Sequence, residues 1–218
     1  PTPEKEGHTF VAWYANAEFT GEAVTTVPGE DCTLYAKWNV NSYELTFENS
    51  DFGTQTLEYG KEMPTPEKVG HSFAGWFTNA EFVGNAVLTV PAEDITVYAL
   101  YLPNKYYVTF ENSDLGTVYL EFDSELPTAT KATETFMGWY ANAELTGEPV
   151  TKVAAQDMTV YAKWGYTVKF ENTDLEDQVL EYVHVLPTIA KEGHVFGGWF
   201  DNAEFAGEAI TKVTQNAT

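Results

Sequence analysis

Short acidic turns hold the side chains of this sequence that are best suited to chemistry. Glu-Asn-Ser-Asp fills residues 48–51 and 111–114, and Glu-Asn-Thr-Asp fills residues 171–174. Their oxygens could bind Ca²⁺, but this ion takes about 6–8 oxygen ligands, and the spacing of an EF-hand loop is absent from the sequence. Asn, Ser and Asp also stabilise tight turns through hydrogen bonds to nearby backbone groups. We therefore expect ordinary Asx turns, with calcium binding as the alternative.

Lysines and histidines also recur, in positions that argue against catalysis. The recurring residues are Lys5, Lys68, Lys131 and Lys191, and His8, His71 and His194. A covalent Lys–Asn bond needs an apolar setting and direct contact, whereas each lysine follows a Pro-rich passage, so we expect solvated lysines. Glu134 replaces the histidine in one copy, which a catalytic or metal-binding role would not tolerate. Since no Ser/His/Asp grouping or zinc-ligand spacing recurs either, we expect no catalytic residue, no metal ligand and no bound cofactor.

Aromatic residues recur at fixed spacing and are the candidates for the hydrophobic core. The candidates are Trp13, Trp76, Trp139, Trp199, Trp38, Tyr101, Trp164, Phe47, Phe110 and Phe170. A phenylalanine also lies three residues before the tryptophans at positions 13, 76, 139 and 199. This odd spacing on a strand predicts that the two side chains face opposite sides. The alternative role for an exposed tryptophan is stacking on a sugar or on a partner chain.

The composition argues against several classes of partner. The chain carries 33 acidic and 11 basic residues, which gives a formal net charge of -22, and every basic residue is a lysine. Nucleic acids and anionic membranes are bound by Lys/Arg clusters, so we expect neither as a partner. No apolar run approaches the ~20 residues that span a bilayer, which predicts no membrane insertion. Cys32 occupies the position of Ile95 and Met158 in other copies, so we expect it to act as a small apolar residue.

The sequence repeats itself four times. The tryptophans of one repeated phrase, at positions 13, 76, 139 and 199, lie 63, 63 and 60 residues apart. A fixed period of this length indicates an array of small units. The predicted units are the partial repeat 1–38 without its opening hairpin, the complete repeats 43–101 and 106–164, and the partial repeat 166–218 without its closing strand. Because the length variation falls between units, the predicted linkers are residues 39–42, 102–105 and 165.

Each unit has the pattern of short strands. In the second unit, alternation of large and polar residues predicts strands at 43–47, 54–59, 72–77 and 95–101, with a further short strand at 86–90. Prolines in residues 60–70 exclude a central strand and make a helix difficult. Asn79 is expected to cap a tight turn after the third strand. The predicted fold class is therefore mainly β, as a tandem array of repeats of roughly 60 residues.

Three segments together resemble the Listeria–Bacteroides repeat family, the type that includes the B-repeat of internalin B. The segments are the strand YTVKF (166–170), the stretch PTPEKEGHTFVAWYANAEFTGEAVT (1–25) and the closing DCTLYAKW (31–38). Two departures, Ala12 in place of glycine and the closing YALY of the second copy, leave every aromatic position filled. The resemblance implies a β-grasp-like (ubiquitin-like) fold with its helix reduced or absent, no enzymatic activity, and a place in large secreted or wall-attached bacterial surface proteins.

Two hypotheses on function follow from these features. The first is an extracellular stalk, spacer or adhesin segment at the cell surface, whose strand edges pair with neighbouring repeats or with copies of the same chain, as in filaments. The alternative is a module that binds a host or cell-surface protein or a glycan through a repeated aromatic patch, strengthened by avidity. A hydrolase has no supporting residues. Asn216-Ala217-Thr218 fits a glycosylation sequon, but a single match of this length is weak.

Overall fold

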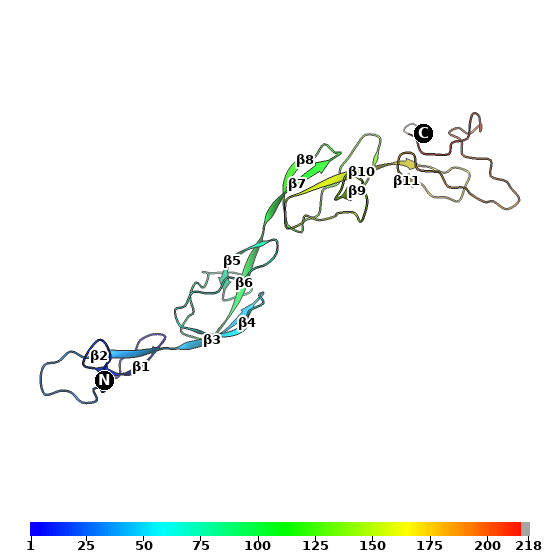
Figure 1. Cartoon of the computed structure of the whole chain (residues 1–218). Helices are drawn as coiled ribbons and strands as arrows, with labels where there is room; N and C mark the ends of the chain where they lie inside the picture. Colours follow the sequence, from blue (N-terminus) through cyan, green and yellow to red (C-terminus); the bar gives the residue numbers. More distant parts are fainter. Residues whose placement is uncertain (215–218) are drawn as a thin grey trace. The chain divides into compact units, whose positions relative to one another are not determined.

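The computed structural model describes residues 1–214, which form strands, turns and irregular segments without a helix (Figure 1). The chain divides into two compact units, Pro1–Pro103 and Asn104–Thr218, each of which is described by itself. The first contains β1 (His8–Tyr14), β2 (Tyr35–Val40), β3 (Ser42–Glu48), β4 (Gly53–Glu58), β5 (His71–Phe77) and β6 (Ile95–Pro103). The second contains β7 (Lys105–Glu111), β8 (Gly116–Glu121), β9 (Thr135–Tyr140), β10 (Met158–Val168) and β11 (Gln178–Leu180). The prediction of a mainly β fold is confirmed.

The second repeat forms a four-stranded sheet in the order β4-β3-β6-β5. β3 and β4 are an antiparallel hairpin, β6 lies parallel to β3, and β5 pairs antiparallel with the other edge of β6. Alternation along β3 directs Leu45 and Phe47 into the core, where they meet Val97 and Ala99 of β6. In the first repeat, β1 and β2 form an antiparallel pair.

The third repeat has the same arrangement. β8 pairs with β7, β7 lies parallel to β10, and β9 pairs antiparallel with the other edge of β10. Val108 and Phe110 from β7 share its core with Val160 and Ala162 from β10. The end of β10 continues into the fourth repeat, where residues 166–168 pair antiparallel with β11.

The acidic segments form hairpin turns, and the turn after β5 is closed by an asparagine as predicted. Ser50 donates a hydrogen bond to the Phe47 carbonyl at 3.2 Å within the first of these turns. The Asn79 side chain accepts from the Val83 amide at 3.0 Å and donates to the Val83 carbonyl at 2.8 Å. The hairpin turns also place three asparagines in the left-handed conformation, which Asn tolerates. These are Asn49, Asn112 and Asn172, with φ of 61°, 59° and 60°.

A β-bulge overturns the prediction that phenylalanine and tryptophan of the third strand face opposite sides. In β5 the pairing with β6 shifts register between Phe73 and Gly75, so one residue is inserted before Trp76. The Phe73 and Trp76 rings therefore lie on the same side, 5.4 Å apart between centroids. The same register shift occurs where β1 pairs with β2 in the first repeat and where β9 pairs with β10 in the third repeat.

The predicted strand at residues 86–90 is wrong. These residues make only isolated bridges, between Val87 and Trp76 and between Thr89 and Glu62. Their neighbour is the Pro-rich passage at residues 60–70, whose prolines cannot donate to a continuous ladder. The passage is instead held at single points, such as the Met63 amide donating to the Leu88 carbonyl at 2.9 Å.

Strands extend into the segments that the sequence predicts as linkers. β2 includes residues 39–40 and β3 begins at Ser42, so Asn41 alone separates them. β6 reaches Pro103 and β7 starts at Lys105. β10 passes through Gly165 without a break. The division of the chain into units 1–38, 43–101, 106–164 and 166–218 stays a prediction from the sequence.

Two further predictions concern individual residues. Cys32 is exposed, whereas Ile95 and Met158 at the equivalent positions pack against the cores of their repeats. The structure therefore does not bear out the expectation that Cys32 acts as a small apolar residue. The sequon at residues 216–218 lies outside the described residues. No helix in residues 1–214 is long and apolar enough to cross a membrane.

Candidate functional site

The tryptophan of the repeated phrase is a core residue in both complete repeats. Trp76 is 1% exposed and Trp139 is 3% exposed. The indole N–H of Trp76 donates to the Pro64 carbonyl at 2.7 Å, and that of Trp139 donates to the Pro127 carbonyl at 2.8 Å. A buried donor without a partner would be costly, so this bond fixes the Pro-rich passage against the sheet. The repeated phrase thus holds each unit together.

The equivalent tryptophans of the outer repeats make the same bond but are only half-buried. Trp13 donates to the Pro1 carbonyl at 3.1 Å, and Trp199 donates to the Pro187 carbonyl at 2.7 Å. In three repeats a phenylalanine from the hairpin packs on the tryptophan ring. The pairs are Phe47–Trp76, Phe110–Trp139 and Phe170–Trp199, with centroids 4.8, 4.7 and 4.8 Å apart. These three phenylalanines are all buried.

The closing aromatics lie at the surface of each repeat, half-buried, and each carries a lysine over its ring. The lysine-to-centroid distances are 6.0 Å for Lys5 over Trp38, 5.1 Å for Lys68 over Tyr101 and 4.5 Å for Lys131 over Trp164. The four recurring lysines are exposed, as expected, and three of them also form cation–π contacts that the sequence did not reveal. Burial, followed by the charge of Asp51, raises the pKa of the Tyr101 hydroxyl.

A small pocket lies beside the closing aromatic of the third repeat. Trp164 borders a cavity of about 370 Å³ together with Asn112, Asp114 and Lys131. The Trp164 indole donates to the Asn112 carbonyl at 3.0 Å, which anchors the ring to the acidic hairpin turn. The pocket therefore combines an aromatic edge, a cation and a carboxylate.

The join between the first and second repeats is built around Asn41. The Asn41 amide donates to the Gly7 carbonyl at 2.9 Å, and the Asn41 carbonyl accepts from the Tyr59 amide at 2.9 Å. One residue thus hydrogen-bonds to both repeats. The Thr9 hydroxyl also donates to the Asn41 side chain. The recurring histidine belongs to this join, because the His8 ring packs edge-on to Tyr59 with centroids 5.7 Å apart.

Gly7 allows the first and second repeats to approach closely. It has a φ of +68°, and a Cβ at this position would lie 2.1 Å from the Tyr59 ring. A side chain at position 7 would therefore displace Tyr59 and strain the backbone. The packing of the two repeats at the join therefore requires a glycine at position 7, whereas neither repeat alone requires one.

The join between the third and fourth repeats uses different residues. Gly165 lies on the continuous strand β10, where a Cβ would meet Met137 Sδ at 2.7 Å and the Leu180 carbonyl at 2.9 Å. The Thr135 and Thr167 hydroxyls are 3.1 Å apart, with one donating to the other. Residues from both repeats therefore pack directly on Gly165, and the residue predicted as a linker is a packing site.

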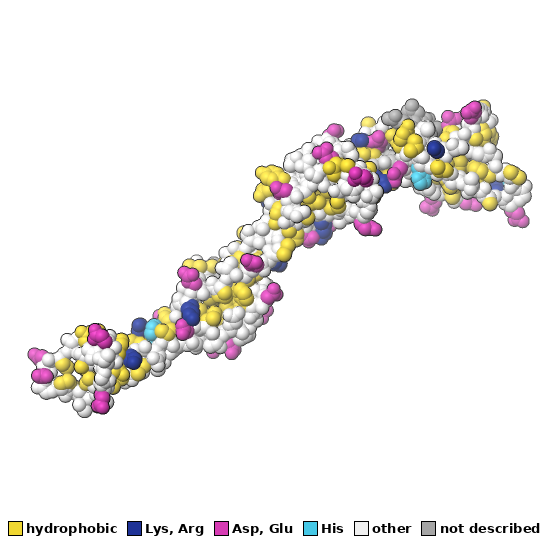
Figure 2. Space-filling model, viewed as in Figure 1, with side chains coloured by type: hydrophobic (Ala, Val, Ile, Leu, Met, Phe, Trp, Pro, Cys, Tyr) yellow, Lys and Arg dark blue, Asp and Glu magenta, His cyan; other side chains and the backbone are white. Residues whose placement is uncertain are grey.

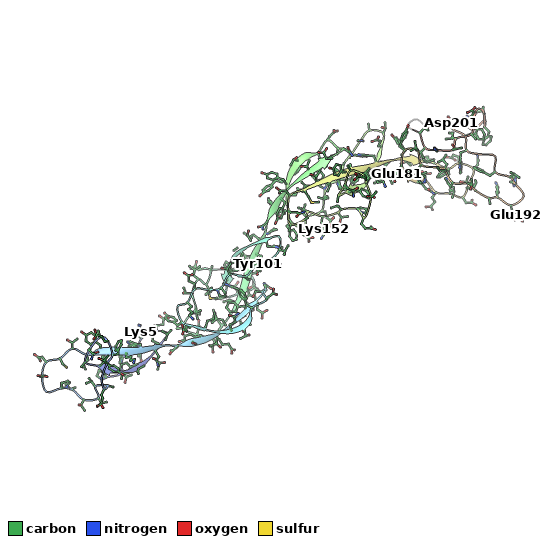
Figure 3. The ribbon with its side chains drawn as sticks, viewed as in Figure 1. Lys5, Tyr101, Lys152, Glu181, Glu192 and Asp201 are labelled. Carbon is green, nitrogen blue, oxygen red and sulfur yellow. The ribbon has the colours of Figure 1, made fainter. Side chains whose placement is uncertain are left out.

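Charged and phenolic groups also connect the third and fourth repeats. Lys163 Nζ lies 2.6 Å from Oε1 of Glu181, the residue labelled in Figure 3. The hydrogen bond to Glu181 raises the pKa of the Lys163 ammonium. The Tyr166 hydroxyl donates to Glu134 at 3.3 Å, and burial, followed by the charge of Glu134, raises the pKa of that hydroxyl. Glu134, which fills the histidine position, is itself paired with Lys131 at 2.7 Å.

The described residues contain no cluster typical of a metal centre. Residues 1–214 hold no group of three or more His, Cys, Asp or Glu side chains that could bind a metal ion. Acidic side chains are scattered over the face shown in Figure 2, with apolar patches between them. The features that recur are the aromatic cores, the closing aromatics and the joins. Among the aromatics that the sequence suggests for the core, Trp76 and Trp139 are buried, whereas the closing aromatics Trp38, Tyr101 and Trp164 are half-buried. The joins were missed because their residues were expected to be linkers.

The recurrence of a small β-sheet with the same strand order defines this chain as a tandem β-repeat protein. A model of the Listeria-Bacteroides repeat domain matches residues 1–37, 43–100, 106–163 and 166–218. The chain therefore belongs to the Listeria-Bacteroides repeat family, and the resemblance read from its sequence is confirmed.

Three of the curated relatives come from two bacteria. The chain is 37% identical over 97% of its length to a protein of Evansella cellulosilytica named as a Gly-rich membrane protein, and it covers 28% of that protein. It is 32% identical over 95% of its length to a second protein of that organism, named as a membrane protein, and covers 36% of it. It is 38% identical over 47% of its length to Internalin H of Listeria monocytogenes and covers 20% of that protein. The chain thus spans about a third or less of these relatives. No solved structure matches it.

Proposed function

We propose that this chain is a non-enzymatic spacer segment of a bacterial surface protein, built to hold other parts of that protein away from the cell. The observation that carries the proposal is the construction of the joins. A spacer must resist bending between units, and here β10 crosses one join without a break while Asn41 hydrogen-bonds to both repeats at another. Family membership and the likeness to Internalin H support an extracellular, cell-surface location. The proposal includes an adhesin as the protein to which the segment belongs. The proposed binding partners of the segment are neighbouring repeats or other copies of the same chain.

We also propose that each repeat is β-grasp-like. The sheet order of second, first, last and third strand, with the first and last strands parallel, supports this assignment. The Pro-rich passage and the bridged segment that follows the third strand cover the sheet in place of a helix. A reduced helix agrees with what the family resemblance implies.

Small-angle scattering of the purified chain across a range of protein concentrations tests the spacer proposal. An elongated particle whose dimensions do not change with concentration is the expected result. A compact particle would reject the proposal, because the joins would then not hold the repeats apart. Growth into long assemblies would assign the role of filament subunit instead and would direct mutation to the strand edges.

A second candidate function is binding of a glycan or a protein at the closing aromatic. The pocket of about 370 Å³ beside Trp164, with Lys131 and Asp114 at its rim, favours it. Titration with a panel of soluble glycans, followed by chemical shifts of the Trp164 indole N–H, tests this function. Shifts that are abolished in Lys131→Ala and retained in Lys5→Ala would support it, and an unchanged Trp164 signal throughout would reject it.

A further inference from the structure

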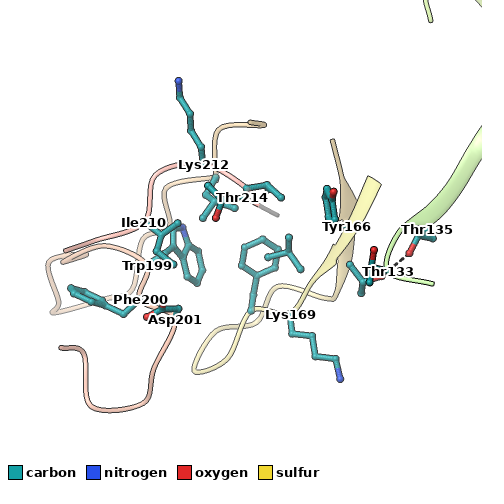
Figure 4. Close-up of a pocket in the computed structure, with 15 residues that line it drawn as sticks. Thr133, Thr135, Tyr166, Lys169, Trp199, Phe200, Asp201, Ile210, Lys212 and Thr214 are labelled. Atoms are coloured by element: carbon teal, nitrogen blue, oxygen red, sulfur yellow. Dashed lines mark hydrogen bonds between the residues drawn. The ribbon is translucent and has the colours of Figure 1, made fainter. Parts of the chain in front are cut away.

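The sheet of the third repeat has one edge strand that is paired on a single side. This strand is β8, which pairs with β7, and no bridge joins it to any other segment of residues 1–214. The opposite edge strand, β9, is covered, because the Val150 amide donates to the Trp139 carbonyl at 2.8 Å. The start of β9 is also occupied, since the Thr135 hydroxyl is hydrogen-bonded to the Thr167 hydroxyl, as the dashed line in Figure 4 shows. The outer backbone groups of β8 are therefore available for pairing.

β8 lacks the residues that usually keep an exposed edge strand from pairing with another chain. Lysine, proline and inward-pointing charges give this protection in many β-sheet proteins. β8 has the sequence GTVYLE, which contains neither lysine nor proline and has its single charge at the last residue. Val118 and Leu120 pack against the core, so alternation places Thr117 and Tyr119 on the outer face. Short segments of this kind, with high β-propensity and little charge, favour strand pairing.

Two exposed tyrosines lie side by side at this edge. Tyr119 of β8 is directly opposite Tyr107 of β7, with ring centroids 4.8 Å apart. The two residues are 54% and 56% exposed, although aromatic rings are costly to leave in water. Tyrosine is enriched at protein interfaces, where its ring is buried and its hydroxyl finds a polar partner. Because Tyr119 is on the edge strand, a strand added to β8 would contact this pair.

The charges around β8 are balanced locally, although the whole chain has a formal net charge of -22. Lys105 Nζ lies 3.4 Å from Glu121 Oε1, and Lys152 Nζ lies 3.0 Å from Asp123 Oδ1. The two acidic residues at the end of β8 are therefore both paired with a lysine. Copies of a strongly acidic chain repel each other, and this edge is a place where that repulsion is reduced.

We propose that β8 is a contact between two copies of this chain, which pair edge to edge with their β8 strands antiparallel about a two-fold axis. The contact joins the sheets of the two third repeats into one. An interface of this symmetry uses the same surface on both copies, so the assembly stops at a dimer. This inference rests on the part of the proposed function that names copies of the chain as partners. It does not depend on the spacer role.

The side chains of β8 favour one register for this pairing. With the axis at Tyr119, this residue lies opposite its own copy, Val118 lies opposite Leu120, and Thr117 lies opposite Glu121. Apolar side chains then meet on the inner face, and the two tyrosine pairs form a ladder of four rings on the outer face. A register centred one residue earlier would place Leu120 opposite a glycine. A register centred at Glu121 would place two carboxylates opposite each other, which is unfavourable.

The corresponding edge of the second repeat provides a control within the same chain. β4 also forms the edge of its sheet and pairs with β3. Its sequence is GTQTLE, so Gln55 and Thr56 occupy the positions of Val118 and Tyr119. This edge has the same length and lacks the aromatic pair and one apolar residue. We therefore expect β4 to pair much more weakly than β8.

Disulfide exchange between whole chains tests the proposal and its register. One chain carries Thr117→Cys and the other carries Glu121→Cys, both with Cys32→Ser. In a glutathione redox buffer, intact mass measures the mixed dimer and the two symmetric dimers. The matched control is Thr54→Cys mixed with Glu58→Cys, at the equivalent positions of β4, again with Cys32→Ser. We expect at least about tenfold more mixed dimer from the β8 pair than from the β4 pair, and a similar excess over the symmetric dimers.

Substitutions at Tyr119 separate pairing from folding. Tyr119→Thr introduces the residue that the second repeat has at this position, so the sheet should stay folded while the mixed dimer falls about tenfold. Tyr119→Lys places two like charges at the axis and should lower the mixed dimer further. Hydrogen exchange of the β7 and β10 amides, unchanged in both variants, verifies that the third repeat is folded.

Several outcomes would overturn the proposal. They are equal mixed dimer from the β8 and β4 pairs, symmetric dimers as abundant as the mixed dimer, and a mixed dimer that persists in Tyr119→Lys. Assemblies larger than a dimer in sedimentation of the native chain would also overturn it. The spacer role is decided separately by the shape of the monomer in scattering, so an elongated monomer without β8 pairing would reject this inference alone.

Discussion

At the residue scale, the fold of the second and third repeats depends strongly on a buried tryptophan, Trp76 in one and Trp139 in the other. Trp76 contacts Phe47, Phe52 and Phe73 and holds the Pro-rich passage through the Pro64 carbonyl. Trp76→Ala removes both the packing and the hydrogen bond, and we expect it to destabilise the second repeat by about 3–5 kcal/mol. Hydrogen exchange of the β3 and β6 amides measures this loss within the second repeat.

Two variants separate the contributions of Trp76. Trp76→Phe keeps an aromatic ring but leaves the Pro64 carbonyl without its donor, so an intermediate loss is expected. Val69→Ala, at a residue that is 77% exposed, should change stability by less than about 0.5 kcal/mol. If Trp76→Ala were as mild as Val69→Ala, the core role of the repeated phrase would be wrong.

The titrating groups at the join between the third and fourth repeats predict a loss of stability in alkaline solution. Lys163 has its pKa raised above the usual 10.5 by its hydrogen bond to Glu181, and Tyr166 has its pKa raised above the usual 10.0 by burial and by Glu134. Both groups bind their proton more tightly in the folded chain than in the unfolded chain. Their contribution is therefore complete below about pH 10, and it is lost as the pH rises through the folded pKa values.

Urea unfolding of the native chain and of Lys163→Met at several pH values checks this prediction. Because Glu181 is 52% exposed at its side chain, solvent screening limits the expected loss for Lys163→Met at neutral pH to about 0.5 kcal/mol. The difference between the two proteins should shrink above pH 10.5. A difference that is constant from pH 7 to pH 11 would contradict the assignment of the ion pair to this join.

At the element scale, the bulge in the third strand determines which side chains reach the core. Gly75 has a φ of +143°, and a Cβ there would lie 3.1 Å from the Ala86 Cβ. Gly75→Ala should therefore cost about 1–3 kcal/mol through backbone strain and crowding. Thermal unfolding of the second repeat, followed by the Phe73 and Trp76 resonances, measures the loss.

Gly29→Ala is the control for the bulge variant, since position 29 has open space and no positive φ. It should leave unfolding unchanged. The first repeat carries Ala12 at the bulge without a positive φ, so the backbone has a second way to form this feature. A neutral Gly75→Ala would show that the second repeat can adopt the conformation of the first.

Much of the element pattern could be predicted from the sequence, because alternation and prolines act locally. β3, β4, β5 and β6 fall close to the residues expected for them, and Asn79 closes the expected turn. The bulge could not be predicted, since an inserted residue changes the face of Phe73 relative to Trp76 without changing the spacing in the sequence. The failed strand at residues 86–90 has the same origin, because its pairing depends on a Pro-rich partner distant in the sequence.

At the scale of the whole molecule, the joins could not be predicted from repetition. Asn41 recurs as Asn104 one period later, whereas the third join holds Gly165, and all three residues were expected to be linkers. The structure assigns Asn41 and Gly165 direct contacts with both neighbouring repeats. Stability in such arrays is the sum of the repeats and of their interfaces. The stability contributed by the interfaces can therefore change in evolution without a change in the cores of the repeats.

Gly165→Ala tests whether the join supports the fourth repeat. The new Cβ would meet Met137 Sδ at 2.7 Å and the Leu180 carbonyl at 2.9 Å, so β11 must move away from β10. Overpacking of this kind costs about 1–3 kcal/mol. Hydrogen exchange at the backbone amides of residues 166–168 and 178–180 should therefore become about tenfold faster or more. The amides of the third-repeat core should keep their protection. Gly197→Ala is the matched control, with no atom within 4 Å of its Cβ and no positive φ. Unchanged exchange at β11 in Gly165→Ala would mean that the fourth repeat is held by its own contacts alone, and the spacer proposal would lose its main structural support.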